Sequence, residues 1–265
     1  LVPITMTLTI SLHDWSMYTP LTQMDYVGLA NYQDLAGDRT FRQALLNTGV
    51  YTHLSVMLIV PLALGAALLI NSPRLRGRTA LRTVLFASYM IPTVAVAIIW
   101  STLYAPQYGP INQALTTVGL PAQAWLGSVD LAMISLVIFN VWQLVGYFTV
   151  LFVAGLMQIP DDLYEAASLD GAGSVRQAAY ITIPLLRRTT TFVVIIAAIN
   201  SVQVFDPIYV LTQGGPANST NVLSYHIYQT AFEFGRAGKA SAMAFVMLAV
   251  LVLAVGPVLR LGRER

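Results

Sequence analysis

Amides, hydroxyls and aromatic rings recur inside three long apolar stretches of this sequence. In one stretch Asn140, Gln143 and Tyr147 stand at offsets of 3 and 7, which places them on one stripe of a helix. Amides and hydroxyls can hydrogen-bond the hydroxyl groups of a sugar, and aromatic rings can cover its C–H faces. The residues that we select as a candidate substrate pathway are Tyr89, Thr93, Asn140, Trp142, Gln143, Tyr147, Asn200 and Gln203.

The same residues have a second interpretation as structural contacts. Asn, Gln and Ser in membrane helices also join neighbouring helices by hydrogen bonds. For any one residue both interpretations stay open, but polar groups are costly inside a membrane, so their recurrence in three stretches favours a pathway. Tyr89, Thr93 and Trp100 add to this, because offsets of 4 and 11 put them near one face if residues 81–104 form a single helix.

The charge of the candidate pathway bears on the class of substrate. No Arg or Lys lies in the middle of the apolar stretches. A doubly charged phosphate ester would need a cation or several backbone N–H groups. The sequence therefore favours a neutral mono-, di- or oligosaccharide, with glycerol-3-phosphate or a glycerophosphodiester as the alternative.

The sequence offers little for catalysis, for metal binding or for nucleic acid. It contains no cysteine, and its three histidines lie far apart, so no metal-ligand spacing is present. Asp161, Asp162, Glu165 and Asp170 form the one acidic cluster, and their spacing suits helix caps better than catalysis. The formal net charge of +2 is too small to indicate a nucleic-acid partner. We expect no metal site and no enzymatic activity.

The elements that carry the candidate pathway are predicted to be transmembrane helices. The chain has 265 residues, of which 56% are hydrophobic and 10% charged, whereas soluble domains have about 25% charged residues. We therefore predict one all-α, multi-pass membrane domain over residues 1–265, with six spans of about 20 residues or more, the first of them truncated. The predicted spans are residues 1–13, 46–70, 81–104, 130–157, 189–211 and 240–260, with Pro61, Pro92 and Pro207 tolerated inside them.

Basic residues predict the orientation of these spans. Ten Arg fall on one side of the membrane and three Arg and one Lys on the other. Since cytoplasmic loops carry the excess of Arg and Lys, both chain ends should be cytoplasmic. The ten are Arg74, Arg76, Arg78, Arg82, Arg176, Arg187, Arg188, Arg260, Arg263 and Arg265, and the four are Arg39, Arg42, Arg236 and Lys239. The external loops are then residues 14–45, 105–129 and 212–239, the last with a turn followed by an amphipathic helix.

A polar segment at residues 163–186 interrupts the apolar sequence on the cytoplasmic side. Asp162 with Glu165, and Ser174 with Gln177, have the spacing of capping boxes, which predicts two short helices joined at the Gly171 corner. Small side chains leave room for a second surface to approach closely. A plain helical loop is the simpler interpretation, but solvent-facing helices without a partner gain little from burial, so we expect a docking role.

Several motifs in this region resemble one family of membrane proteins. The segment is similar to the EAA motif of the permease subunits of ABC importers, in Glu165-Ala166-Ala167, Asp170-Gly171-Ala172-Gly173 and Ile183-Pro184-Leu185-Leu186. Residues 140–143, 205–216 and 225–241 are similar to stretches of carbohydrate-uptake permeases of the maltose and glycerol-3-phosphate type. The resemblance extends from the second span onward.

The resemblance implies a type I importer permease fold and a set of partners. Residues 160–187 would form the cytoplasmic coupling segment, with Glu165, Ala166, Ala167, Asp170, Gly171, Ala172 and Gly173 meeting an ATP-hydrolysing subunit. The chain itself would bind no cofactor, while partner subunits would use ATP and Mg. Those partners would be two nucleotide-binding subunits, a second permease in a heterodimer and an extracytoplasmic solute-binding protein, in the inner membrane of a bacterium. In relatives the positions matching Tyr89, Thr93, Asn140, Gln143, Tyr147 and Gln203 lie at or near the sugar site.

Two other classes of function, an ion-coupled carrier and a membrane-embedded enzyme, fit the sequence less well than a transport subunit. The one Gly-Lys pair, Gly238-Lys239, lacks the other residues of a phosphate-binding loop, so the chain should not bind ATP itself. An ion-coupled carrier would show internal symmetry or acidic groups within the spans, and neither is evident. A membrane-embedded enzyme would need convergent acids or histidines, and these are absent as well.

Overall fold

The computed structural model describes residues 2–72 and 75–263, and the chain divides into two compact units. One unit, which we call the α14 unit, consists of residues 1–53, 93–139 and 200–253. The other, which we call the α8 unit, consists of residues 54–92, 140–199 and 254–265. Of the arginines used to predict orientation, Arg74 and Arg265 lie outside the described residues.

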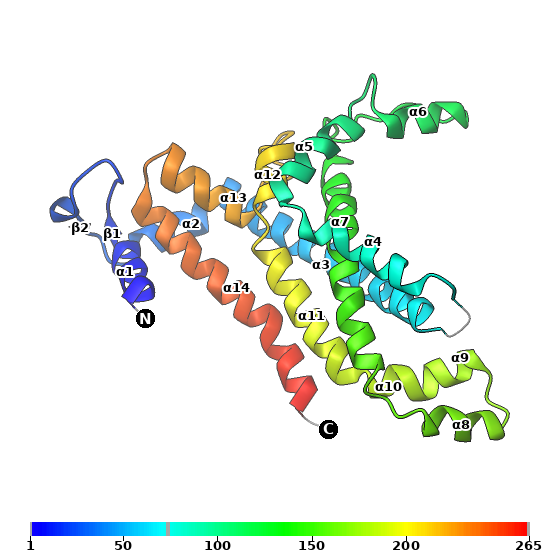
Figure 1. Cartoon of the computed structure of the whole chain (residues 1–265). Helices are drawn as coiled ribbons and strands as arrows, with labels where there is room; N and C mark the ends of the chain where they lie inside the picture. The colour runs from blue at the N-terminus through cyan, green and yellow to red at the C-terminus, as the bar shows by residue number, and fades with distance from the viewer. Residues whose placement is uncertain (1, 73–74, 264–265) are drawn as a thin grey trace. The chain divides into compact units, whose positions relative to one another are not determined.

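Long apolar helices dominate both units (Figure 1), which confirms the all-α membrane class. Four are long and apolar enough to cross a membrane: α3 (Arg39–Asn71), α7 (Ala132–Leu156), α11 continued by α12 (Arg187–Leu211), and Ala237–Gly256 of α14 (Ala237–Arg263). A fifth is counted if the broken pair α4 and α5 is one span, and α1 (Val2–Ser11) is a shorter apolar helix. The described residues thus include four or five candidate spans plus α1, where the sequence predicted six.

The predicted span 81–104 is not one straight helix, and this expectation is wrong. It consists of α4 (Arg78–Met90) and α5 (Thr93–Leu103), separated by extended backbone at Ile91, with φ −82° and ψ 136°. Pro92 accounts for the break, because a proline ring disfavours helical geometry in the residue before it. The single face expected for Tyr89, Thr93 and Trp100 therefore does not exist. Pro61, in contrast, is accommodated inside α3 as predicted.

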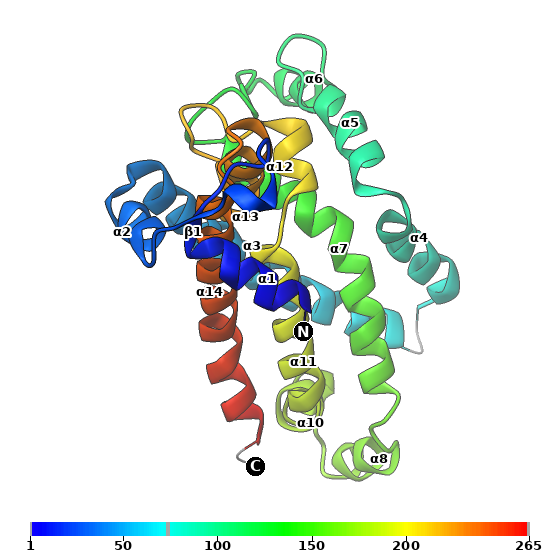
Figure 2. The same ribbon diagram turned by 90° about the vertical axis from the view of Figure 1, so that its left-hand side faces the viewer.

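The α14 unit contains several short elements between its long helices (Figure 2). After α1, strands β1 (His13–Asp14) and β2 (Asp25–Tyr26) pair in antiparallel register and enclose the short helix η1 (Leu21–Gln23). The unit also includes α2 (Ala30–Gly37), α6 (Pro110–Thr117), α12 (Asp206–Leu211), α13 (Leu223–Tyr228) and the π-helical turn η3 (Gln229–Glu233). The helix predicted after the turn in residues 212–239 is thus present, whereas α6 lies in a stretch that we expected to be a loop.

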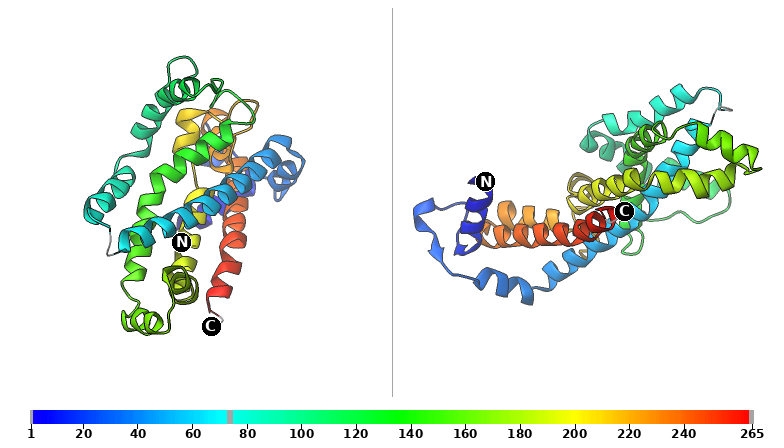
Figure 3. Two further views of the ribbon diagram at one scale, coloured as in Figure 1. Left: turned by 90° about the vertical axis from the view of Figure 1, so that its right-hand side faces the viewer. Right: turned by 90° about the horizontal axis from the view of Figure 1, so that it is seen from below.

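The α8 unit is organised around one apolar core. Ile59 of α3, Phe148 and Phe152 of α7 and Val193 of α11 are fully buried in it. The polar segment predicted from the sequence belongs to this unit and comprises α8 (Asp162–Leu169), α9 (Ser174–Gln177), the π-helical turn η2 (Ala178–Thr182) and α10 (Ile183–Leu185). Figures 1 and 3 show α8 lying alongside the run from α9 to α10. The core therefore holds the root of this segment through Leu186, which is 1% exposed.

Candidate coupling and substrate sites

The corner of the coupling segment, residues 160–187, is a Schellman motif. The Ala172 N–H donates to the Ala167 carbonyl at 2.8 Å, and the Gly171 N–H donates to the Ser168 carbonyl at 3.1 Å. Gly171 has a φ of +77°, a left-handed conformation that only glycine adopts without steric cost. The predicted glycine corner is present, and its geometry explains why a glycine follows Asp170.

After the corner, the chain runs through α9, η2 and α10 without an extended residue between them. Gln177 and Thr182, at the two boundaries of η2, both have right-handed helical dihedrals. The π-helical turn precedes Pro184, which has no N–H to donate to the carbonyl four residues earlier and crowds it with its ring. A wider turn relieves this crowding, and such turns are frequent at functional sites.

The two capping boxes predicted for this segment are wrong. Asp161, rather than Asp162, precedes α8, and Gly173, rather than Ser174, precedes α9; neither makes a side-chain cap hydrogen bond. The Gln177 amide instead reaches across the corner, donating to the Ser168 hydroxyl at 2.9 Å and to the Ala172 carbonyl at 3.0 Å. The sequence identified Gln177 as important, but its partners come from the fold.

A second contact joins the two arms of the segment at its base. The Tyr164 and Thr182 hydroxyls are 3.0 Å apart and hydrogen-bonded. Thr182 is 3% exposed, and Tyr164 packs against the core of the α8 unit. The segment is therefore held at its corner and at its base.

The outer surface of the coupling segment carries apolar side chains that sequence analysis did not select. Leu169, Val175 and Tyr180 are 91%, 81% and 80% exposed. The Glu165 side chain is exposed too, and within the described part of the chain it has no hydrogen-bond partner. Exposed apolar groups beside a free carboxylate are typical of a surface that meets another protein. The signal that could have found them is apolar residues flanking the glycine corner.

A groove lies between the coupling segment and the end of α3 within the α8 unit. Its volume is about 910 Å³. Leu68 and Leu69 line one side, while Tyr164, Val175 and Ala178 line the other. The groove therefore separates part of the coupling segment from the end of α3.

Five of the eight predicted pathway residues belong to the α8 unit, where α4 lies against α7. The Tyr89 and Tyr147 rings are stacked, with centroids 4.5 Å apart. The two helices approach closely because of Gly146: a Cβ added there would lie 1.8 Å from the Leu85 carbonyl oxygen. The Ser88 hydroxyl also reaches the Trp142 carbonyl at 3.3 Å. The structure therefore brings the Tyr89 and Tyr147 rings together.

The other three pathway residues in this unit differ in exposure. Asn140 and Gln143 are 7% and 5% exposed, whereas Trp142 is 40% exposed. The Asn140 amide nitrogen is buried with no hydrogen-bond partner among the described residues. A buried donor without a partner is uncommon in proteins, and it is unsuited to joining helices.

Thr93, Asn200 and Gln203 belong to the α14 unit. Thr93 begins α5, and Gln203 lies in the break between α11 and α12. Asn200 and Gln203 are exposed, while Thr93 is partly buried. Beside them is an aromatic cluster that the sequence analysis missed, in which Phe205 stacks on Tyr209 at 5.4 Å. The cluster consists of Phe205, Tyr209, Tyr225, Tyr228 and Phe232.

The loop between α12 and α13 is anchored by polar residues of α3. The Asn47 amide donates to the carbonyls of Asn218 and Asn221 at 2.8 and 2.9 Å. The Thr48 hydroxyl accepts a hydrogen bond from the Leu223 N–H at 2.8 Å. This anchoring was not predicted, although polar residues four and five positions apart on α3, from Gln43 to Thr48, carry a signal for it.

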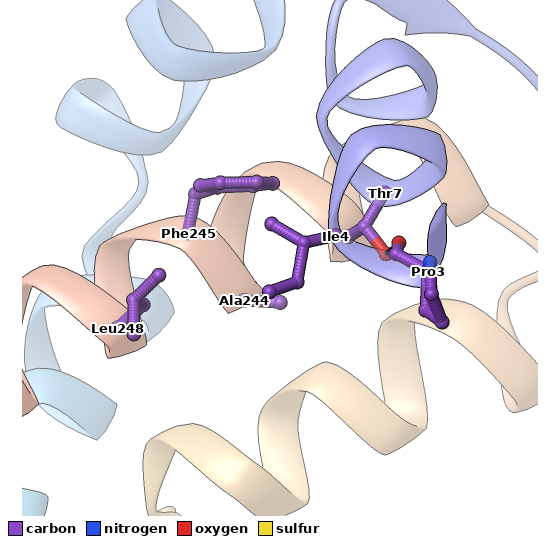
Figure 4. A pocket seen from close by; sticks show the side chains of 6 residues that line it. All are labelled: Pro3, Ile4, Thr7, Ala244, Phe245 and Leu248. Carbon is purple, nitrogen blue, oxygen red and sulfur yellow. Dashed lines mark hydrogen bonds between the residues drawn. The ribbon is translucent and has the colours of Figure 1, made fainter. Parts of the chain in front are cut away.

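An apolar groove of about 200 Å³ lies between α1 and α14 (Figure 4). Ile4 extends from α1 toward Ala244 and Phe245 of α14, and Pro3, Thr7 and Leu248 complete the lining. Such a lining suits hydrocarbon rather than a sugar, because it has few hydrogen-bonding groups. Among the described residues no group of three His, Cys, Asp or Glu could hold a metal ion.

Comparison with known proteins gives the family. Residues 59–261 match the family described as binding-protein-dependent transport system inner membrane component. The chain is 36% identical to the trehalose/maltose transport system permease protein of Thermococcus litoralis, over 100% of this chain and 88% of that protein. It is 33% identical to the diacetylchitobiose uptake system permease protein of Streptomyces coelicolor, over 96% of this chain and 74% of that protein.

The fold agrees with this relationship. A crystal structure of a bacterial ABC transporter for the acidic polysaccharide alginate contains a chain that superimposes with a TM-score of 0.86 at 23% identity, covering 98% of this chain and 89% of that one. The fold is therefore that of an ABC importer permease, and the chain is a transport component rather than an enzyme. It belongs to the family of inner membrane components of binding-protein-dependent transport systems.

Proposed function

We propose that this chain is the permease subunit of an ATP-driven importer that carries a sugar into the cytoplasm. The observation that carries the proposal is the coupling segment, whose corner and base are fixed while Leu169, Val175 and Tyr180 stay exposed. A segment built this way can transmit motion from a partner without deforming. Relatives named for trehalose, maltose and diacetylchitobiose support a sugar as the substrate.

The proposed topology places the coupling segment in the cytoplasm. Arg176, Arg187 and Arg188 lie within or next to it, as expected for a cytoplasmic segment. The span Arg187–Leu211 starts directly after the segment. Residues 212–236 are then external, and α14 returns the chain to the cytoplasm. The excess of Arg on the cytoplasmic side supports the same placement for both termini.

The proposed partners follow from what this chain lacks and what it exposes. It has no phosphate-binding loop in its sequence, so ATP and Mg would be bound by two separate nucleotide-binding subunits. The exposed apolar side chains and Glu165 would dock on one of these subunits. A second permease would complete the membrane passage, and an extracytoplasmic binding protein would deliver the sugar. The permease with the bound ATPases would alternate between outward and inward access.

The proposed substrate is a neutral sugar. The pathway residues supply amides, hydroxyls and rings, including the stacked Tyr89 and Tyr147 and the free Asn140 amide. These groups suit hydroxyls and C–H faces. A phosphate ester stays the second candidate, and it would need cations from the second permease.

Reconstitution tests the proposal directly. The chain would be co-expressed with its neighbouring transporter genes and assembled in liposomes, and ATP hydrolysis measured with each candidate sugar and binding protein. Leu169→Glu and Glu165→Lys should abolish stimulated hydrolysis while the complex still assembles. Leu120→Glu is a matched control, since Leu120 is also exposed, at 52%, but lies in the loop after α6. Unchanged hydrolysis in both coupling variants would contradict the proposal.

A further inference from the structure

A polar cavity of about 360 Å³ lies within the α14 unit, at the start of α14. It is separate from the predicted pathway residues, none of which lines it. Its walls come from the residue before α3, the loop after α12, the α13 and η3 helices, and the first turns of α14. The side chains that matter here are Asp38, Asn221, His226, Arg236 and Lys239. A cavity of this volume is within the range of small-molecule sites.

Two buried side chains that line this cavity have unused hydrogen-bonding atoms. His226 is 6% exposed and Asn221 is 1% exposed. Within the described residues, the two ring nitrogens of His226 have no hydrogen-bond partner. The side-chain oxygen of Asn221 has none either. Buried polar atoms are almost always paired, because leaving one unpaired costs about 1–3 kcal/mol. The unpaired atoms of both residues therefore indicate that a ligand with hydrogen-bonding groups enters the cavity.

The charges around the cavity indicate a neutral ligand. The one full anion, the Asp38 carboxylate, is held by Lys239 at 2.8 Å and by the Thr40 and Phe41 N–H groups. Burial lowers the pKa of His226, the nearby Asp38 raises it and Lys239 lowers it; the net lowering keeps the imidazole neutral at pH 7. A neutral imidazole has one donor and one acceptor.

The buried part of the cavity offers no unpaired cation to an anionic ligand, because Lys239 is paired with Asp38 and Arg236 is exposed at the rim. The Asp38 carboxylate and the Asn221 oxygen both present acceptors to the cavity, and the Lys239 cation is already paired. Arg236 is exposed and can supply N–H donors at the rim. Mixed donors and acceptors match a hydroxyl group, which both donates and accepts.

We infer that this cavity is a sugar subsite outside the membrane pathway, which holds one ring of the substrate through hydroxyl contacts with His226 and Asn221. The inference rests on the proposed function and deepens it. In the proposed topology residues 212–236 are external, so the subsite would receive the sugar before it enters the pathway. A ring held here lowers the chance that a released sugar diffuses away.

Footprinting of the assembled transporter tests binding itself. Diethyl pyrocarbonate modifies imidazole nitrogens, and mass spectrometry reads each of the three histidines separately. Maltose, trehalose and lactose at millimolar concentration are the probes, with the binding protein omitted. A transported sugar should slow modification of His226 severalfold and leave His13 in β1, which does not line the cavity, unchanged. If the sugar that wild type imports gives His226 no protection, the inference is overturned.

A variant separates the subsite from a structural role. His226→Phe keeps a ring but removes both nitrogens, so loss of two hydrogen bonds should raise the KM for uptake about tenfold. His53→Phe is the matched control and should leave the KM unchanged. An unchanged KM with a raised melting temperature would mean that the cavity has no sugar partner, and would overturn the inference. A raised KM accompanied by weaker association of the sugar-free binding protein with His226→Phe would assign the loss to protein docking and would overturn the inference.

The outcomes distinguish this inference from the proposed function. If wild type imports none of the probes and no sugar stimulates its ATP hydrolysis, the proposed function fails. Protection of His226 by one of the three sugars in that case still supports the subsite. Absence of protection by all three overturns the subsite, whatever the transport result.

Discussion

The side-chain amide of Gln177 donates to the Ser168 hydroxyl at 2.9 Å, so one residue joins the two arms of the coupling segment across their corner. The same amide donates to the Ala172 carbonyl at 3.0 Å, directly after Gly171. Ser168 in turn donates to the Tyr164 carbonyl at 2.8 Å. These linked hydrogen bonds hold the corner together, so that it can move as one rigid unit.

Replacing Gln177 with Leu should loosen that unit. The substitution removes two hydrogen bonds of about 1 kcal/mol each, while the volume of the side chain is roughly kept. We expect faster amide exchange at Gly171 and Ala172 and a several-fold drop in sugar-stimulated ATP hydrolysis. Gln113→Leu in α6, where the amide bonds the Tyr108 carbonyl, is the control. Equal hydrolysis in the two variants would show that the clamp does not contribute to coupling.

Two glycines of the corner should respond differently to the same substitution. Gly171 has a φ of +77°, whereas Gly173 has a φ of −71°, and a Cβ would meet no atom within 4 Å at either position. Gly171→Ala should therefore cost about 1–2 kcal/mol of local stability through backbone conformation alone, and Gly173→Ala almost nothing. Amide exchange of residues 162–177 and stimulated ATP hydrolysis are the measurements. A defect shared by both variants would mean that the partner surface, not the backbone, rejects the methyl group.

The contact between α4 and α7 depends on the missing side chain of Gly146. A Cβ there would overlap the Leu85 carbonyl, so Gly146→Ala should separate the helices and destabilise the protein by about 1–3 kcal/mol. The Tyr89–Tyr147 stack should be disturbed, and uptake should fall. Gly49→Ala in α3 meets no atom within 4 Å and should leave the melting temperature and uptake unchanged. A Gly146→Ala variant with normal stability would refute the close approach.

Asn140 separates the pathway interpretation from the structural one. Its amide nitrogen is buried and has no partner in the part of the chain that the structure describes, so Asn140→Leu removes a desolvation cost and should not lower stability. Uptake should nevertheless fall at least tenfold if this amide binds the sugar. Thermal unfolding and uptake are measured on the same preparation. If the variant is destabilised and its uptake falls only as far as the amount of folded protein falls, a role in helix packing is favoured.

The Asp38–Lys239 pair predicts a small acid-dependent change in stability. Burial would raise the pKa of Asp38, but hydrogen bonds from Lys239, Phe41 and Thr40 and the Lys239 charge lower it below 3.8. A lowered folded-state pKa contributes stability above the unfolded value, which is lost as the pH falls through the folded value. The pair is partly exposed, so at most about 1 kcal/mol is at stake.

Asp38→Asn tests this sign. Wild type should lose more stability than the variant when the pH falls from 7 to below 3.8, the ordinary pKa of the carboxyl group. The melting temperature of the purified protein across this range is the measurement. Asp34→Asn in α2, whose carboxylate has no ion-pair partner among the described residues, should follow wild type. Parallel curves for wild type and Asp38→Asn would contradict the assignment.

Local patterns predicted much of the fold and part of the site. Runs of about 20 or more apolar residues fixed α3, α7, α11 with α12, and α14, because hydrocarbon tolerates only backbone that bonds to itself. Pro92 was a visible signal for a helix break in the sequence. Pro61 lies inside the continuous helix α3, so a proline by itself does not predict where a helix breaks. The capping box at Ser174 and Gln177 failed because the Gln177 amide bonds Ser168 and Ala172 across the corner instead. The box at Asp162 and Glu165 failed because Asp162 already lies within α8.

The sequence by itself determined a multi-pass membrane chain with a glycine-cornered polar segment, because apolar length and Asp170-Gly171 are local properties. The permease family was indicated by the resemblance of its motifs. The tertiary structure decided which polar groups meet. Tyr89 stacks on Tyr147 since Gly146 lets α4 approach α7, and the His226 cavity forms from residues as far apart as Asp38 and Met243. Contacts of this kind depend on packing between distant segments, and no periodicity in the sequence encodes them.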